Sequence, residues 1–188
     1  MVVEIDVSIK IKVRNGVYPP SEDSYFLIEC IEVEKEKSLD MGTGTGIIAL
    51  HMAKKGAIVT AADKNAEAVI NAKENAKING LNINVVQSDL FSSIHENFDV
   101  IVFNPPYLPS DEVYSEAWNG GKDGVEIAER FLEEAKDYLN PKGRMYLLLS
   151  TLGNIKKLIN RFNSIYKFRE IKTLPLFFEK LIVYEITR

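Results

Sequence analysis

From residue 38 onward, short apolar runs typical of buried strands alternate with longer segments whose apolar residues recur at helical spacing. A strand, a helix and a second strand in succession form a βαβ unit, in which the strands lie parallel and the helix covers a face of the sheet. No other feature of the sequence restricts the fold as strongly. The chain is therefore expected to be an α/β protein with a doubly wound, mostly parallel sheet and one domain spanning residues 1–188.

The alternation predicts the individual elements. Strands are expected at Ser38–Met41, Ile58–Ala62, Asn84–Gln87, Phe98–Phe103 and Arg144–Ser150, and helices at Ile47–Lys54, Ala66–Ile78, Val125–Leu139 and Asn154–Phe162. Two further strands, Lys167–Thr173 and Leu181–Ile186, are separated by too few residues for a helical crossover. They are expected to pair as an antiparallel hairpin at one edge of the sheet.

The segment before residue 38 has a different pattern. Val3–Val13 alternates apolar and mostly polar residues, which is the period of a half-buried strand. Ser21 can cap a helix that runs to about Glu32, with Glu22 and Asp23 as acidic residues of its first turn. The residues expected to face the core are Tyr25, Leu27, Ile28 and Ile31.

Composition excludes several classes of protein. With 46% hydrophobic and 27% charged residues, the chain can bury a core and is not expected to be disordered. No apolar run approaches the roughly 18 residues of a membrane helix, and the first residues do not form a signal peptide. A cytoplasmic protein with no membrane partner is expected.

The numbers of cysteines, histidines and charged residues exclude further classes of protein. Cys30 is the only cysteine, so no internal disulfide is expected, and His51 and His95 lie too far apart in sequence to indicate a metal site. The 23 basic and 27 acidic residues give a net charge of −4. This balance argues against direct binding to nucleic acid, which depends on a basic surface.

A glycine-rich segment, Asp40–Gly46, follows the strand at Ser38–Met41 and precedes a helix. In doubly wound sheets, ligands bind outside the carboxyl ends of the strands, where glycines allow the backbone to approach them closely. The spacing is G-x-G-x-G, one residue shorter than the dinucleotide fingerprint G-x-G-x-x-G. It favours a nucleoside without a pyrophosphate, and the alternative is a glycine-rich turn with no ligand.

Acidic residues follow the next two strands. Asp63 can accept hydrogen bonds from ribose hydroxyls, or it can cap the helix that starts near Asn65. Asp89 can accept from the exocyclic amine of adenine, or it can be an ordinary turn residue. Three consecutive strand ends with an acidic residue, the first with glycines as well, indicate an adenosine site.

The sequence Asn104-Pro105-Pro106-Tyr107 directly follows the apolar strand Phe98–Phe103. The prolines fix the backbone, so the carbonyl groups of Asn104 and Pro105 have defined directions. The Asn104 side chain adds another acceptor, and Tyr107 can stack on a flat amide or base. The motif is suited to holding a planar NH₂ group, and the alternative is a proline-terminated strand followed by a surface turn.

Together, the D-x-G-x-G-x-G loop and Asn-Pro-Pro-Tyr resemble class I methyltransferases, which have a Rossmann-like, seven-stranded sheet and use S-adenosylmethionine. Tyr18–Ser24 (Tyr-Pro-Pro-Ser-Glu-Asp-Ser) and Trp118–Gly124 are similar to the short archaeal and eukaryotic branch of the HemK-like glutamine methyltransferases. The resemblance covers nearly the whole chain. It implies a single methyltransferase domain that modifies the glutamine amide in the Gly-Gly-Gln loop of a class I translation release factor.

The resemblance also implies roles for individual residues. Asp40 and Gly42 would hold the methionine end of the cofactor, with Ser24 nearby. Asp63 would bind the ribose, and Asp89 with the backbone of Leu90 would bind the adenine. Gly44 and Gly46 complete the glycine loop, and Asn104 would also border the cofactor. Catalysis would depend on Asn104, Pro105, Pro106 and Tyr107. Relatives in the eukaryotic branch work with a small zinc-binding activator protein, so such a partner is also expected.

No strong base is evident in the motif, so catalysis is expected to depend mainly on positioning of the amide nitrogen by Asn104 and the Pro105 carbonyl. One alternative is methylation of an exocyclic base nitrogen of RNA or DNA, which presents a similar NH₂ group. Another is a non-catalytic scaffold that pairs with an active subunit. The segment 109–124 is interpreted either as a lid or docking loop over the site, or as an irregular surface loop.

Overall fold

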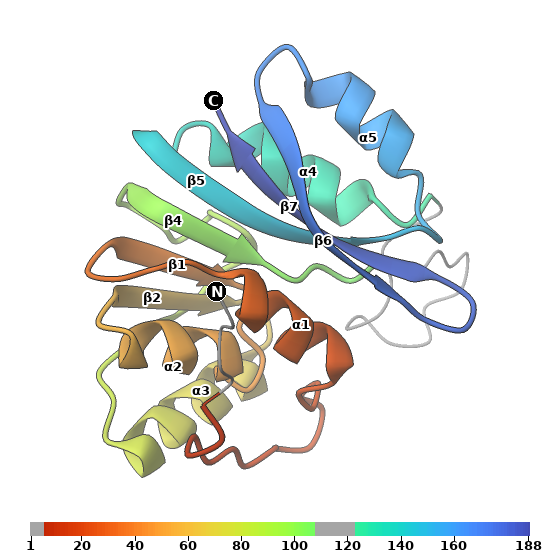
Figure 1. The fold of residues 1–188 in the computed structure, drawn as a ribbon. Helices are drawn as coiled ribbons and strands as arrows, with labels where there is room; N and C mark the ends of the chain where they lie inside the picture. The colour runs from red at the N-terminus through yellow and green to blue at the C-terminus, as the bar shows by residue number, and fades with distance from the viewer. Residues whose placement is uncertain (1–5, 108–122) are drawn as a thin grey trace.

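The computed structural model describes residues 6–107 and 123–188. Its centre is a seven-stranded sheet with the strand order β3-β2-β1-β4-β5-β7-β6 (Figure 1). The strands are β1 (Lys37–Met41), β2 (Ile58–Asp63), β3 (Asn84–Gln87), β4 (Phe98–Phe103), β5 (Leu139–Ser150), β6 (Lys167–Pro175) and β7 (Lys180–Thr187). Strands β1 to β5 are parallel, whereas β7 lies antiparallel between β5 and β6. The predicted fold class and the C-terminal hairpin are confirmed.

Helices cover both faces of the sheet. The helices are α1 (Glu22–Cys30), α2 (Ile47–Lys54), α3 (Ala66–Asn79), α4 (Glu126–Ala135) and α5 (Ile155–Phe162). One apolar cluster joins the sheet to α4 and α5, and the other joins it to α1, α2 and α3 (Figure 1). Strands β2, β4, β5 and β7 contribute to both clusters, so their apolar residues form nearly continuous runs, as the sequence pattern predicted, whereas β1 contributes Leu39 and Met41 to the first cluster.

The register of the central strands brings their carboxyl ends to one edge. Met41 at the end of β1 is paired with Ala62 of β2 and with Phe103 of β4, and Asp63 at the end of β2 is paired with Gln87 of β3. The segments that follow these strands therefore begin close together. This alignment positions the three motifs that the sequence analysis selected.

The predicted N-terminal strand is wrong in the part that the structure describes. Ile9–Val13 belongs to no strand. It lies along α3, and the side-chain amides of Asn71, Asn75 and Asn79 form hydrogen bonds with its backbone. The half-buried period of two is present at Ile9 and Ile11, but the partner is a helix surface instead of a neighbouring strand.

Other differences concern the boundaries of elements. Helix α1 ends at Cys30, before the predicted Glu32, and Tyr25 in it is 36% exposed instead of facing the core. Ser21 occupies the N-cap position of α1 without a side-chain capping hydrogen bond.

The predicted helix at Val125–Leu139 is too long. Helix α4 ends at Ala135, and Leu139 already pairs with Phe98 as the first residue of β5. The Asn140 side chain donates to the Asp99 carboxylate at 2.7 Å, which ties this start of β5 to β4. In the described residues, no helix has the length and apolar character needed to cross a membrane.

Candidate active site

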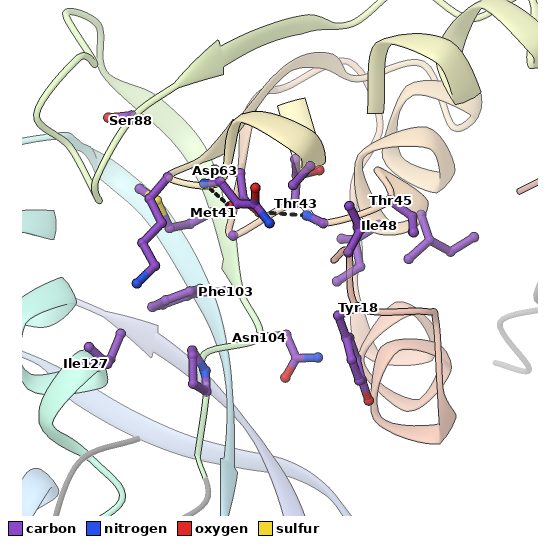
Figure 2. Close-up of a pocket in the computed structure, with 18 of the residues that line it drawn as sticks. Tyr18, Met41, Thr43, Thr45, Ile48, Asp63, Ser88, Phe103, Asn104 and Ile127 are labelled. Carbon is purple, nitrogen blue, oxygen red and sulfur yellow. Dashed lines mark hydrogen bonds between the residues drawn. The ribbon is translucent and has the colours of Figure 1, made fainter. Parts of the chain in front are cut away.

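A cavity of about 930 Å³ opens at the carboxyl ends of β1, β2 and β4 (Figure 2). Its size is in the range of pockets that bind small ligands. The glycine-rich segment, the ends of β2 and β4, the turn after β3, and residues around Tyr18 all contribute to its wall. Of the predicted site residues, those lining the cavity are Ser24, Gly42, Gly44, Asp63, Asp89, Leu90, Asn104 and Pro106.

The three glycines of the loop after β1 have positive φ angles for different structural reasons. At Gly44, a Cβ atom would have only the Tyr18 carbonyl oxygen within 4 Å, at 3.9 Å, so the backbone is open toward the cavity. At Gly42, a Cβ atom would lie 3.1 Å from the Phe103 ring. At Gly46, it would lie 3.1 Å from Ala72 Cβ, and Gly46 does not line the cavity. Gly46 therefore serves the packing of the loop against α3.

Asp40 lies beneath this loop and is only 1% exposed. Its Oδ2 atom accepts from the Thr43 hydroxyl at 2.6 Å and from the Ala49 N–H at 3.1 Å, so it holds the two ends of the loop. Burial raises the Asp40 pKa to about 7, and the nearby charge of Asp63 contributes in the same direction. Asp40 does not itself line the cavity, so its hydrogen bonds with Thr43 and Ala49 stabilise the loop and do not reach the cavity.

Asp63 lies between the glycine loop and the start of α3. Its Oδ2 atom accepts from Gly44 N–H and its Oδ1 atom from Asn65 N–H, both at 2.9 Å (Figure 2). Burial raises its pKa. The residue that caps α3 is Asn65, which accepts from Glu67 N–H at 3.0 Å. Asp63 therefore fixes the loop and still presents its carboxylate to the cavity.

The turn after β3 provides the opposite wall. Leu90 has a φ of 46°, the left-handed region that non-glycine residues rarely adopt, and its carbonyl oxygen accepts from the Ser88 hydroxyl at 2.6 Å. Asp89 is close to Arg130 of α4, with 3.4 Å between the guanidinium Nη2 and each carboxylate oxygen. Arg130 also lines the cavity and was missed by the sequence analysis.

Asn104 begins the segment after β4, and its side chain points toward the ring of Tyr18 (Figure 2). Its Nδ2 atom donates to Asp23 Oδ2 at 2.9 Å, whereas its Oδ1 atom is buried without a hydrogen-bond partner. Because a carboxylate only accepts, the amide must direct its NH₂ group to Asp23. The Asn104 Oδ1 atom is therefore an acceptor with a fixed direction and no hydrogen bond, although buried polar atoms usually have a partner.

Asp23 lies in the first turn of α1, as predicted, but the sequence analysis missed its role in the site. It is 5% exposed and accepts from Tyr18 Oη at 3.1 Å, Ser24 N–H at 2.7 Å and Tyr107 Oη at 3.4 Å, besides Asn104. Its position four residues before Leu27, on the buried face of α1, was the available signal. Asp23 thus joins the Tyr-Pro-Pro-Ser-Glu-Asp-Ser motif to the Asn-Pro-Pro-Tyr motif.

The rest of the Asn-Pro-Pro-Tyr motif lies around this contact. Pro106 lines the cavity, whereas Pro105 and Tyr107 do not. The pKa of the Tyr107 phenol is raised by burial first and by the charge of Asp23 second, so Tyr107 stays neutral and can donate. Of the predicted lid at 109–124, residues 109–122 lie outside the described residues.

Comparison with known proteins places the chain among methyltransferases. Residues 9–173 match the family model of the methyltransferase small domain. A candidate protein N5-glutamine methyltransferase of Methanocaldococcus jannaschii is 41% identical over the full length of both chains. The release factor glutamine methyltransferase of Streptococcus pneumoniae is 40% identical over 73% of this chain. The chain spans 55% of the length of that bacterial relative.

A solved structure supports the same grouping. The Mtq2–Trm112 complex of E. cuniculi, described as responsible for methylation of the eRF1 translation termination factor, contains a chain that is 28% identical to this one. The two superpose with a TM-score of 0.76, over 92% of this chain and 99% of that one. Two other methyltransferase structures with the same fold contain S-adenosylmethionine or S-adenosylhomocysteine. They are 22% and 17% identical to this chain, so they show the shared fold alone.

Proposed function

We propose that this chain, which belongs to the methyltransferase small domain family and its HemK-like branch, methylates a protein glutamine. The donor is S-adenosylmethionine, and the acceptor is the side-chain amide nitrogen in the Gly-Gly-Gln loop of a class I translation release factor. The full-length similarity to a glutamine methyltransferase and the similarity to Mtq2 support this assignment. The observation that carries it is the buried, unpaired Oδ1 atom of Asn104.

The unpaired oxygen needs a donor, and a primary amide offers one. Asp23 holds the NH₂ end of Asn104, so the side chain cannot turn over without losing that bond. A glutamine NH₂ group placed against the oxygen would give it one hydrogen bond, with the other N–H directed to the Pro105 carbonyl. Both contacts would hold the nitrogen with its lone pair away from the acceptors. This selects an NH₂-bearing substrate over a hydroxyl or a thiol.

An amide nitrogen is a weak nucleophile, because its lone pair is delocalised into the carbonyl. We propose that the site compensates mainly by orientation, which can contribute up to about 7 to 11 kcal/mol to lowering a barrier. S-adenosylmethionine would supply an electrophilic methyl group on a sulfonium sulfur. Asn104 and Pro105 would direct acceptors at the nitrogen as it gains positive charge, which stabilises the transition state further. As the N–C bond forms, the S–C bond would break to leave a neutral thioether, and the methylated nitrogen would release one proton to solvent.

The residues around the cavity fit the adenosine part of this donor. Gly44 leaves the backbone open to a ligand, and Asp63 presents a carboxylate where ribose hydroxyls would lie. Asp89 and the Leu90 backbone would contact the adenine from the opposite wall. Asp40 would act on the methionine end only through the loop that it holds.

We also propose that the chain works in the cytoplasm with a small activator protein. The solved complex pairs Mtq2 with Trm112, and the sheet of this chain ends in β3, whose outer side has no neighbouring strand among the described residues. A free strand edge can pair with another chain. Co-expression with such an activator is therefore included in the test below.

The test is transfer of labelled methyl groups to a purified class I release factor, with and without the activator. A factor in which the Gly-Gly-Gln glutamine is replaced, and total cellular RNA, serve as parallel acceptors. Label on the intact factor that disappears in the replaced one is the expected result. Label on RNA alone would instead favour the base-methylation alternative and overturn the proposed function.

A further inference from the structure

The loop between β6 and β7 carries two adjacent aromatic residues, Phe177 and Phe178, on the surface. They are 92% and 85% exposed, and their rings meet edge to face with centroids 4.6 Å apart. Leu176 N–H donates to the Glu179 carbonyl at 2.8 Å, so the two phenylalanines are the two central residues of a tight turn. We refer to Phe177 and Phe178 as the aromatic tip.

The turn does not require aromatic residues. Two-residue hairpin loops usually contain glycine, asparagine or aspartate, because these residues suit the backbone of a tight turn. The tip also contributes little to the core, since both side chains are almost fully exposed. A paired, exposed aromatic surface of this kind indicates an interaction site.

The hairpin places the aromatic tip at the same end of the sheet as the Asn-Pro-Pro-Tyr motif (Figure 1). Glu179 accepts a hydrogen bond from the hydroxyl of Ser150, the last residue of β5, and Lys180 N–H donates to Thr151 Oγ1 at 2.8 Å. Leu176, next to the tip, packs against the same apolar cluster as Tyr107. Figure 1 shows the β6–β7 loop on the side of the sheet to which β4 points. The tip therefore lies at the edge where the acceptor must reach Asn104.

The occupant we favour is the protein that carries the acceptor glutamine. A single amide side chain offers little surface for selection, so a protein substrate must be held by contacts outside the cavity. Two aromatic rings can bury about 300 to 500 Å², which is roughly half of one partner's share of a standard interface. The net charge of −4 disfavours a phosphate backbone as the occupant.

We propose that the aromatic tip docks the folded release factor and so delivers its glutamine to Asn104; this inference rests on the proposed function. Exposed aromatic residues that become buried in an interface are frequently the residues that dominate its affinity. In the strand order, the tip between β6 and β7 lies on one side of β4, whereas the residues proposed to hold the cofactor follow β1, β2 and β3 on the other side. Substitution of the tip should therefore weaken binding of the protein substrate and leave binding of the cofactor unchanged.

The test compares Phe177→Ser/Phe178→Ser with wild type and with the control Ile58→Ser. Ile58 is 68% exposed and is the first residue of β2, so it lies at the amino end of that strand, away from the carboxyl ends that face the site. For the double variant, the affinity for the intact factor and the kcat/KM of its methylation should fall by at least about tenfold. The dissociation constant of the cofactor, measured by calorimetry, should be unchanged in all three proteins.

The outcomes separate the two proposals. Equal affinity and kcat/KM in wild type and the double variant would overturn the docking role while leaving the proposed function intact. A wild-type protein that binds and labels no release factor, with or without the activator, would overturn the proposed function and this inference with it. Loss of a dimer in the double variant, seen by size-exclusion chromatography without loss of factor affinity, would identify a second copy of the chain as the occupant instead.

Discussion

The two ends of the Asn104 side chain have different surroundings, and this difference predicts the effect of removing it. The nitrogen is held by Asp23 and the oxygen has no partner. Asn104→Ala should reduce kcat by at least about a hundredfold, because the acceptor amide loses the group that orients it. The dissociation constant of the cofactor should change by less than about threefold. Near-normal turnover in this variant, measured with labelled cofactor, would contradict the proposed mechanism.

Asp23 is expected to act through Asn104 as a positioning residue. Asp23→Ala removes the bond that fixes the Asn104 amide, so kcat should fall by about ten- to a hundredfold, which corresponds to the roughly 1.5 to 3 kcal/mol of a hydrogen bond to a charged group. The KM for cofactor should change little. The measurement is a double-mutant cycle with Asn104→Ala.

The cycle distinguishes positioning from a general structural effect. If Asp23 acts through Asn104, adding Asp23→Ala to Asn104→Ala lowers kcat no further. Additive losses in the double variant would mean that Asp23 affects the site by another route, for example through its contacts with Tyr18 and Ser24.

At the residue scale, sequence reasoning identified positions more reliably than contacts. Asn104, Asp63 and Gly44 could be selected because special residue types follow strands, and all three line the cavity. The bond between Asp23 and Asn104 joins residues 81 positions apart, so only tertiary packing reveals it. Gly46 was assigned to the cofactor because a close approach to a ligand and a close approach to Ala72 both require glycine.

The N-terminal segment shows how a correct pattern can indicate a wrong element. An alternating half-buried period describes any extended chain with one covered face, and here the covering surface is α3. Asn71, Asn75 and Asn79 recur every four residues, so they lie on one face of the helix. Each bonds backbone groups of the extended segment, as a neighbouring strand would. The period predicted the extended conformation but not its partner.

Asn75, unlike Asn79, also forms a hydrogen bond with the glycine loop, and this difference is testable. It bonds the backbone of Lys12, and its Nδ2 atom also donates to the Thr45 carbonyl of the glycine loop at 2.9 Å. Asn75→Ala should therefore weaken cofactor binding by about tenfold, since it releases one side of the loop and leaves buried groups unpaired. Asn79→Ala removes an equivalent pair of bonds to Lys10 and a bond to the Asn75 carbonyl, all away from the loop.

Calorimetric titration of both variants with cofactor makes the comparison. Asn79→Ala is expected to bind cofactor like wild type, although both variants lose stability. Equal weakening in the two variants would mean that the asparagine row only fastens the N-terminal segment, with no specific effect on the cofactor loop.

At the scale of the whole molecule, the sheet explains why three distant motifs form one site. The alternation of strands and helices was sufficient to predict the parallel order, because βαβ units have few alternatives. The hairpin pairing of β6 with β7 was predicted, whereas the position of β7 between β5 and β6 and the start of β5 at Leu139 were not. Asn140, Pro141 and Gly143 are typical of a helix end, and here they lie inside the strand.

The same architecture buries Asp40 in the middle of the sheet, and this has a consequence for stability. Burial raises its pKa to about 7 from an ordinary value of 3.8, so the folded state holds a proton that the unfolded chain releases. The free energy of unfolding should therefore fall as the pH rises from about 4 to about 7, at most by about 1.4 kcal/mol for each unit of the shift. Asp63, whose pKa is also raised, acts in the same direction.

Asp40→Asn isolates this contribution, because an amide resembles the protonated acid and can still accept from Thr43 and Ala49. We expect urea unfolding to show a larger stability of the variant relative to wild type at pH 8 than at pH 5, with the change concentrated between pH 4 and pH 7. Titrating groups that do not interact with Asp40 cancel in the difference, which therefore reports Asp40 together with its interaction with Asp63. A difference that stays constant with pH would show that Asp40 is ionised in the folded protein throughout, and that the Thr43 and Ala49 bonds suffice to offset its burial.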